Sequence, residues 1–128
     1  SYYPADEWTL DYMRQVKEIL DQHGTKLLMV SAPNPLNWTT SKHNTLQEWC
    51  DQNNVTYIDY NLKPEELNIN WLTDSRDGGD HLNYSGSVKF MNVLGKYLQE
   101  NYELTDHRND PAYTKWNEDY KSIFGGAQ

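Results

Sequence analysis

The chain is poor in the features that mark several classes of protein. Its single cysteine, Cys50, excludes an internal disulfide and lies in a helix-like run, where we expect it to be a buried small hydrophobe. The longest apolar run is Leu27–Val30, far short of the roughly 18–20 residues that cross a bilayer. No basic segment followed by an apolar stretch indicates a signal peptide. Neither a disulfide scaffold nor a transmembrane helix is therefore expected.

Positive charge is scarce as well. Lys and Arg total 11 against 19 Asp and Glu, which gives a formal net charge of -8. Because phosphate binding requires clustered Lys and Arg, nucleic acid is not expected as a partner, and neither is an anionic membrane surface. Aromatic residues make up 13% of the 128 residues. They can supply a hydrophobic core and argue against a disordered chain, so one folded domain is expected.

The hydrophobic pattern predicts alternating helices and strands. The predicted helices cover Asp6–Gln22, Ser41–Gln52 and about Ser85–Glu100, and the predicted strands cover Lys26–Ser31 and Val55–Asp59. This order favours parallel strands joined by a right-handed crossover in an α/β fold. Asp110 and Pro111 predict the start of a short amphipathic helix. Since two strands would leave both edges of a sheet exposed, we expect one part of a larger α/β fold, or pairing with another chain.

The densest set of chemical groups lies in a loop between periodic segments, where functional groups tend to occur. His81 stands there beside Asp80 and close to Asp77. An imidazole next to a carboxylate can take a proton from a hydroxyl while the carboxylate orients the ring. Two alternatives stay open: a solvated acidic loop, and a cation site made by Asp74, Asp77 and Asp80, whose spacing does not match an EF-hand. The other histidines do not pair at metal-ligand spacing, so no zinc site is expected, and His43 is expected to be an exposed helix residue.

The run Asp77–Gly86, followed by an amphipathic helix, resembles the last conserved block of SGNH/GDSL-type hydrolases. In that family an Asp and a His near the C-terminus complete a triad with a serine near the N-terminus. The resemblance implies a three-layer flavodoxin-like parallel sheet, with residues 1–104 as its C-terminal part and residues 105–128 as an extension. The usual Asp stands three residues before the His, where this chain has Gly78. Asp77 is therefore the expected triad carboxylate, and Asp80 is the alternative.

The family's serine motif does not occur in this sequence. There is no Gly-Asp-Ser or Gly-x-Ser segment and no Gly-x-Asn-Asp block for an oxyanion hole. Ser31 follows a predicted strand but lacks the glycine of a tight nucleophile elbow. Ser85 and Ser87 are expected to cap the helix that follows the motif. We therefore expect the nucleophile to come from residues outside this chain, and the 128 residues alone to be inactive.

The resemblance extends to bacterial proteins that act on cell-envelope polymers, including relatives of D-alanyl transfer proteins of teichoic-acid synthesis and polysaccharide O-acetyltransferases. It implies an acylated carbohydrate or wall-polymer substrate, a membrane acyltransferase partner, an extracytoplasmic location and no cofactor. The expected substrate-binding residues are Asn34, Trp38 and Asn83, with Trp38 and Trp71 as platforms for a sugar ring. Asn34 can equally be a turn former beside two prolines. The alternative function is a non-catalytic α/β module that binds a glycan or a protein.

Overall fold

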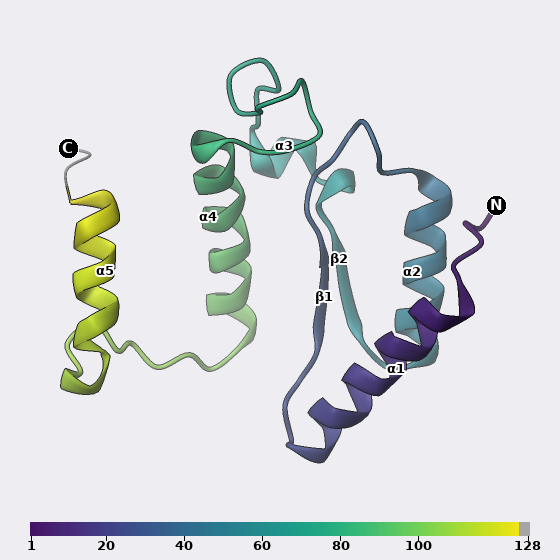
Figure 1. The fold of residues 1–128 in the computed structure, drawn as a ribbon, viewed down its shortest axis with the longest axis horizontal. Coiled ribbons are helices and arrows are strands. Elements are labelled where there is room, and N and C mark those ends of the chain that lie inside the picture. The colour runs from purple at the N-terminus through teal and green to yellow at the C-terminus, as the bar shows by residue number, and fades with distance from the viewer. Residues whose placement is uncertain (126–128) are drawn as a thin grey trace. The chain divides into compact units, whose positions relative to one another are not determined.

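The computed structural model describes residues 1–125 and divides the chain into two compact units (Figure 1). The first unit runs from Ser1 to Val93, and the second begins at Leu94. The boundary expected after residue 104 lies inside the second unit. Residues 126–128 of the expected C-terminal extension lie outside the described residues.

The first unit opens with the predicted alternation of helices and strands. Its first elements are α1 (Glu7–Gln22), β1 (Leu28–Ser31), α2 (Thr40–Gln52) and β2 (Thr56–Asp59). The strands pair in parallel, with Leu28 opposite Thr56 and Ser31 opposite Asp59. These are the only strands of a sheet between residues 1 and 125. The α/β class and the parallel pairing are therefore confirmed, in the form of a two-stranded sheet.

Local signals fix the ends of these helices. Gly24 follows α1 with a φ of +66°, a conformation that glycine adopts without strain. The side chain of Thr39 accepts a hydrogen bond from the backbone N–H of Lys42 and caps the start of α2. Asn54, just beyond the end of α2, takes a φ of +54°, and the chain then turns into β2.

A small core lies between the helices and one face of the sheet. Trp49 and Cys50 of α2 are buried together with Val55, and Leu10 and Met13 of α1 pack against them. The Cys50 side chain is fully enclosed, as expected, and burial raises the pKa of its thiol to about 11. Cys50 is therefore an inert core residue rather than a reactive thiol.

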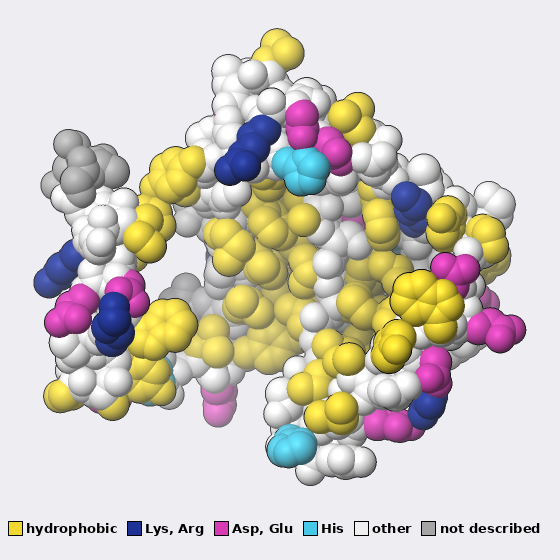
Figure 2. Space-filling model, in the orientation of Figure 1, with side chains coloured by type: hydrophobic (Ala, Val, Ile, Leu, Met, Phe, Trp, Pro, Cys, Tyr) yellow, Lys and Arg dark blue, Asp and Glu magenta, His cyan; other side chains and the backbone are white. Residues whose placement is uncertain are grey.

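The apolar residues of α1 form a stripe that is only partly covered, where Leu10 and Met13 pack against the core. Trp8, Tyr12, Val16 and Ile19 are all at least half exposed. Figure 2 shows hydrophobic side chains gathered along α1 and beside the strands. These side chains of α1 stay largely in solvent because the two-stranded sheet is too narrow to cover them.

Three further elements follow β2 in the first unit. They are η1 (Tyr60–Leu62), α3 (Pro64–Leu67) and the first part of α4 (Tyr84–Asn101). The ring of Tyr60 is almost fully buried and meets the ring of Phe90 edge-on, with 5.2 Å between the ring centres. This contact ties α4 to the end of β2. The loop between α3 and α4 carries the predicted catalytic residues.

The second unit holds the remainder of α4, η2 (Pro111–Tyr113) and α5 (Thr114–Phe124). Asp110 accepts a hydrogen bond from the backbone N–H of Ala112, as predicted for a capping residue before Pro111. The ring of His107 stacks on Tyr113 with 4.1 Å between ring centres. The predicted short C-terminal helix is thus confirmed.

Candidate active site

The loop that carries the predicted catalytic residues is folded as a tight hairpin. Ser75 and Leu82 form an antiparallel bridge, and the backbone N–H of Arg76 donates to the carbonyl of His81 over 3.0 Å. Gly78 and Gly79 form the tip with φ values of +74° and +128°, which residues with a side chain rarely adopt. The two glycines therefore allow the chain to reverse and bring His81 back toward Asp77.

Asp77 holds the imidazole of His81 directly. One oxygen, Oδ2, lies 2.7 Å from Nδ1 of His81. The other oxygen, Oδ1, accepts the backbone N–H groups of Asp80 and His81 at 3.0 and 2.7 Å. All of these interactions favour the ionised carboxylate, and the pKa of Asp77 is lowered, chiefly by its hydrogen bond with His81.

The ring of His81 is open to solvent. Its side chain is 69% exposed. The hydrogen bond with Asp77 and then the charge of Asp80 raise the pKa of His81 above 6.5. With Nδ1 occupied by the carboxylate, Nε2 is left to exchange a proton with a reactant. This arrangement has the form of the base and orienting carboxylate of a nucleophilic hydrolase.

Asp80 takes a different position from Asp77. Its Oδ2 atom lies 3.5 Å from Nδ1 of His81. Its Oδ1 atom accepts hydrogen bonds from the side-chain amides of Asn34 and Asn37. Of the two carboxylates considered from the sequence, Asp77 thus makes the close hydrogen bond to the imidazole, and Asp80 attaches the hairpin to the loop that follows β1.

Asn34 connects this attachment to the end of β2. Its backbone N–H donates to Oδ1 of Asn61 over 2.6 Å, while its side-chain amide donates to Asp80 over 3.0 Å. Gly79 packs against the same loop, because a Cβ at this position would lie 3.1 Å from Cγ of Pro35. Asn34, which the sequence predicts to bind substrate, thus holds the hairpin close to the ends of both strands.

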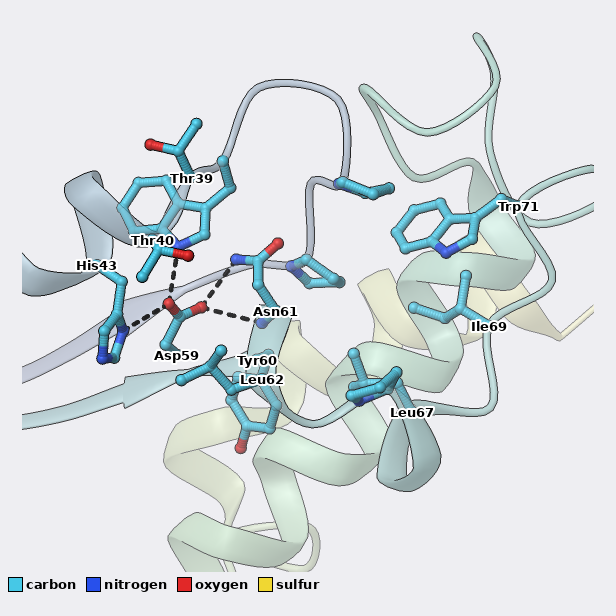
Figure 3. Close-up of a pocket in the computed structure, with 14 residues that line it drawn as sticks. Thr39, Thr40, His43, Asp59, Tyr60, Asn61, Leu62, Leu67, Ile69 and Trp71 are labelled. Carbon is cyan, nitrogen blue, oxygen red and sulfur yellow. Dashed lines mark hydrogen bonds and ion pairs between the residues drawn. The ribbon is translucent and has the colours of Figure 1, made fainter. Parts of the chain in front are cut away.

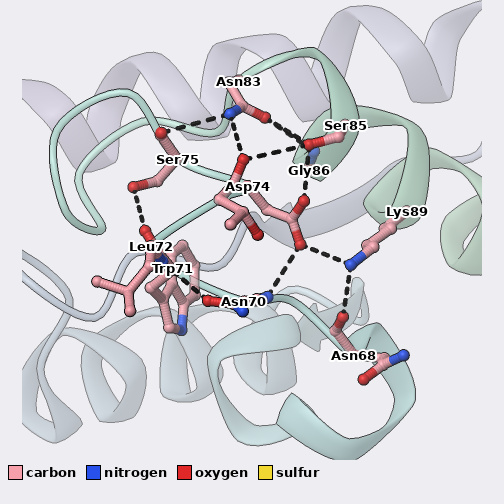
Figure 4. A network of polar contacts seen from close by, with 11 residues as sticks. Asn68, Asn70, Trp71, Leu72, Asp74, Ser75, Asn83, Ser85, Gly86 and Lys89 are labelled. Carbon is pink, nitrogen blue, oxygen red and sulfur yellow. Dashed lines mark hydrogen bonds and ion pairs between the residues drawn. The ribbon is translucent and has the colours of Figure 1, made fainter.

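The base of the hairpin is built around a buried carboxylate (Figure 4). Asp74 is 3% exposed and accepts from the ammonium of Lys89 at 2.6 Å, the hydroxyl of Ser85 at 2.6 Å and the backbone N–H of Asn70 at 2.9 Å. These hydrogen bonds, with Lys89 the largest, lower the pKa of Asp74 to about 2. Asp74 therefore lies apart from Asp77 and Asp80, which overturns the cation site proposed for the three of them.

Asn83 is the capping residue of α4. Its side-chain oxygen accepts from the backbone N–H of Gly86 at 3.1 Å and from the hydroxyl of Ser85 at 2.9 Å, and its amide donates to the carbonyl of Thr73 over 2.7 Å. Asn83 was expected to bind substrate, but these contacts engage its amide within the loop. The expectation that Ser85 and Ser87 cap this helix is wrong, since the hydroxyl of Ser85 is directed to Asp74 and Asn83.

A second aspartate–histidine pair lies at the end of β2. Nδ1 of His43 is 2.8 Å from Oδ2 of Asp59, and the side chain of His43 is 20% exposed. The indole N–H of Trp38 donates to the same Asp59 oxygen over 2.7 Å. Burial opposes the charge of Asp59, but hydrogen bonds from Asn61, Trp38 and His43 outweigh it and lower its pKa. His43 is therefore not the exposed helix residue that was expected.

This second pair lies in the wall of a cavity of about 310 Å³ (Figure 3). The cavity is also lined by Trp38 and Trp71, the two residues predicted from the sequence to be platforms for a sugar ring. Sequence reasoning missed His43 and Asp59 because they are 16 residues apart and come from different elements. Only the position of Asp59 at the end of a predicted strand pointed to this edge of the sheet.

Ser31 is not arranged as a nucleophile. Its hydroxyl lies 2.7 Å from the hydroxyl of Tyr57 on the neighbouring strand. Burial raises the pKa of Tyr57 to about 12, so this phenol is a poor proton acceptor from serine. No hydrogen bond between Ser31 and a histidine occurs among residues 1–125. The absence of a serine nucleophile, expected from the missing motifs, is consistent with this geometry.

Asp77, Asp80 and His81 bring their ligand atoms within 4.8 Å of one another, close enough to surround a cation. The oxygens of Asp77 already accept backbone and imidazole N–H groups, however, and one oxygen of Asp80 accepts the amides of Asn34 and Asn37. The cluster therefore has few free oxygens for a hard cation such as Ca²⁺, which takes 6–8 oxygen ligands.

Comparisons with known proteins add no relative. No protein-family model, no curated protein and no solved structure matches this chain. Within residues 1–125, none of the helices combines the length and the apolar character that crossing a membrane requires.

Proposed function

We propose that this chain is the C-terminal part of an SGNH-like domain that hydrolyses or transfers an acyl ester. The observation that carries this proposal is the Asp77–His81 pair, in which a carboxylate at 2.7 Å orients a solvent-open imidazole on a hairpin with two glycines at its tip. The hairpin leads directly into the capped helix α4, in the order of the family's last conserved block. The complete domain would be a three-layer flavodoxin-like sheet in which β1 and β2 are neighbouring strands.

In the proposed reaction His81 acts first as a base and then as an acid. A serine hydroxyl attacks the ester carbonyl as its proton passes to Nε2 of His81. The tetrahedral intermediate then releases the alcohol, which receives that proton, and leaves an acyl-serine. Water or an acceptor hydroxyl, deprotonated by His81, attacks the acyl-serine and frees the serine. Asp77 stays ionised throughout and stabilises the imidazolium.

The serine and the donors of the oxyanion hole are proposed to come from residues outside this sequence. Ser31 is engaged by Tyr57, and both strands of the described sheet have a free edge. An added strand next to β1 would bring a serine loop to the carboxyl ends of the strands, where the loop of Asn34 meets Asp80. That placement would bring the serine of the added strand to His81 and Asp77 and so complete the catalytic triad.

The substrate class and the location follow from the resemblance alone. We propose an acylated carbohydrate or wall polymer as the substrate, a membrane acyltransferase as the source of acyl groups, and an extracytoplasmic location. The acidic character of the chain, with a net charge of -8, agrees with a substrate other than nucleic acid. No cofactor is required for acyl transfer through serine, histidine and aspartate.

The proposal is tested by adding the missing residues. The 128-residue chain is expected to give no serine-dependent hydrolysis of p-nitrophenyl acetate. The longer polypeptide that contains the serine strand is expected to hydrolyse it and to lose about 10³-fold or more of its kcat on His81→Ala. His23→Ala, which changes an exposed histidine just after α1, is the matched control and should retain activity. Turnover by the short chain that disappears with Ser31→Ala, or full activity of the longer His81→Ala variant, contradicts the proposal.

A second candidate is a non-catalytic module that binds a glycan. The cavity lined by Trp38 and Trp71 favours it, because this cavity is complete within the chain and needs no external residue. In that case His81→Ala would leave the activity of the longer protein unchanged, while changes to the cavity would weaken binding.

A further inference from the structure

The cavity lined by Trp38 and Trp71 lies where ligands bind in α/β sheets. Pro33 and Pro35, in the loop that follows β1, form one part of its wall, and Asp59 and Asn61, at the end of β2, form another. The carboxyl ends of parallel strands are the usual place for a ligand in such folds. A volume of about 310 Å³ is near the lower limit for ligand pockets, which suits one ring better than a long polymer.

The cavity is polar at one end and apolar at the other. In Figure 3, Trp71 and Ile69 lie on one side, and Asp59 and His43 lie on the other. Leu67, which is 3% exposed, closes the apolar part. A ligand that fills this space therefore needs both an apolar surface and polar groups at its edge.

Two hydrogen-bonding groups of the lining are left for a ligand. Within residues 1–125, the indole N–H of Trp71 and the hydroxyl of Thr40 make no hydrogen bond, although both residues line the cavity. The indole N–H of Trp38, in contrast, is already bound to Asp59. Among the described residues no buried side-chain polar atom lacks a partner, so both groups are open to solvent, and a ligand hydroxyl can take the place of water at the N–H of Trp71.

The lining excludes other classes of ligand. Among the described residues that form it there is no Lys or Arg to pair with a phosphate or a carboxylate. Both oxygens of Asp59 already accept hydrogen bonds, from Trp38 and His43 on one side and from Asn61 on the other, so a metal ion finds no free carboxylate oxygen there. A pure hydrocarbon would cover Thr40 without satisfying its hydroxyl.

We propose that this cavity binds a single pyranose ring. The C–H face of the ring packs on the indole of Trp38, and the ring hydroxyls bond to the N–H at the edge of Trp71 and to the hydroxyl of Thr40. The choice of a sugar rests on the proposed function, which acts on an acylated carbohydrate. The position of the site rests on the lining alone. The buried Asp59 is a positioning residue, because it fixes Trp38 and His43 without reaching the ligand.

The test is a titration of the ¹⁵N-labelled 128-residue chain with methyl β-D-glucopyranoside and with the methyl glycoside of N-acetylglucosamine. The indole N–H signals of Trp71 and Trp38 are expected to shift and to saturate in the millimolar range. Trp71→Ala should weaken binding about tenfold or more. Thr40→Val, an exposed substitution that leaves the fold intact, should weaken it by a smaller factor. Trp116→Ala, which removes a 74% exposed indole of α5, is the matched control and should bind as the unmodified chain does.

Three results overturn the inference: neither glycoside gives a saturable shift of these indoles, Trp71→Ala binds as well as the unmodified chain, or cyclohexanol binds and neither glycoside displaces it. Its failure is separable from failure of the proposed function, because His81→Ala should leave sugar binding intact. If the longer His81→Ala protein loses catalysis but the cavity binds no sugar, the proposed function is supported and the sugar site is not. If the cavity binds sugar but His81→Ala leaves catalysis unaffected, the sugar site is supported and the proposed function is not.

Discussion

Gly86 packs so closely on the backbone of Asp74 that a Cβ at position 86 would collide with the Asp74 carbonyl oxygen. This contact joins the first turn of α4 to the base of the hairpin that carries Asp77 and His81, beside the salt bridge of Asp74 with Lys89. The glycine is therefore required by its neighbours and not by its own φ, which is helical.

Gly86→Ala is expected to lower the free energy of unfolding by roughly 2 kcal/mol, because an added methyl group must push the hairpin away from α4. Gly95 lies in the same helix and has nothing within 4 Å of its added Cβ. Gly95→Ala should raise the free energy of unfolding by roughly 0.5–1 kcal/mol, the usual gain from alanine in a helix. Urea denaturation of both variants checks the pair, and an unchanged midpoint for Gly86→Ala contradicts the packing argument.

The buried salt bridge of Asp74 predicts sensitivity to acid. The pKa of Asp74 falls from 3.8 to about 2 on folding. The contribution of Asp74 to stability is therefore complete above pH 3.8 and is lost as the pH falls toward about 2. Asp74→Asn should therefore lower the melting temperature at pH 7 by roughly 5 °C or more, and the difference from the unmodified chain should shrink at pH 2.5. Thermal unfolding followed by circular dichroism at the two pH values measures both effects.

Asp110→Asn provides the matched control for this experiment. Asp110 is about half exposed at its side chain and caps η2 through a local hydrogen bond, which asparagine can replace. Its substitution should change the melting temperature little at either pH. A difference between Asp74→Asn and the unmodified chain that persists in full at pH 2.5 would show that the charge of Asp74 is not the cause.

The hydrogen bond between Asp77 and His81 predicts a raised histidine pKa. The pair favours the protonated ring. Its contribution to stability is therefore complete below pH 6.5 and is lost as the pH rises through the raised pKa of His81. The proposed reaction needs the neutral ring, so the rate of the longer protein should rise over the same pH interval. Titration of the His81 ring by NMR is expected to give a pKa above 6.5 in the unmodified chain.

The same titration distinguishes the two carboxylates beside His81. Asp77→Asn should lower the pKa of His81 markedly, since it removes the largest cause of the shift. Asp80→Asn removes only a charge at 3.5 Å and should lower it less. The reverse order would assign the orienting role to Asp80 and contradict the arrangement described above.

The second aspartate–histidine pair predicts a large loss of stability. Asp59→Ala leaves the N–H groups of Trp38 and His43 without an acceptor in a buried position. The expected cost is about 3 kcal/mol of the free energy of unfolding. Asp51→Ala, at an exposed position of α2, should change it by less than about 0.5 kcal/mol. Denaturant unfolding of the two variants compares them directly, and equal stability of both would contradict the burial of the Asp59 network.

Much of this fold could be predicted because its signals are local. The strand Leu28–Ser31 is a continuous apolar run, and the glycine after α1 and the Asp110–Pro111 pair mark helix boundaries within a few residues. The hairpin could be predicted for the same reason, since Asp77 and His81 are four residues apart and joined by glycines. Residue type and spacing are sufficient when both partners lie in one turn.

The residues that sequence reasoning missed or misplaced depend on contacts between distant segments. His43 was expected at the surface because no residue near it in the sequence indicates that Asp59 of β2 is its partner. The hydrogen bond of Asn34 could not be foreseen either, since its partner Asp80 lies 46 residues away. The apolar stripe of α1 gave the correct helix but not its environment, because a periodic pattern does not say how wide a sheet is available to cover it.

The acidic loop that holds Asp77 and Asp80 is not expected to bind Ca²⁺. Ca²⁺ in the millimolar range is expected to shift the melting temperature by less than about 1 °C, because a ligand that does not bind the folded chain cannot stabilise it. The oxygens of Asp77 are engaged by N–H groups of the hairpin, and a cation would have to displace the hydrogen bond with His81. A thermal-shift series with Ca²⁺ and with EDTA measures this. A rise in melting temperature that EDTA reverses and that Asp80→Asn abolishes would instead establish a metal site at Asp77, Asp80 and His81, and it would make the imidazole a ligand rather than a base.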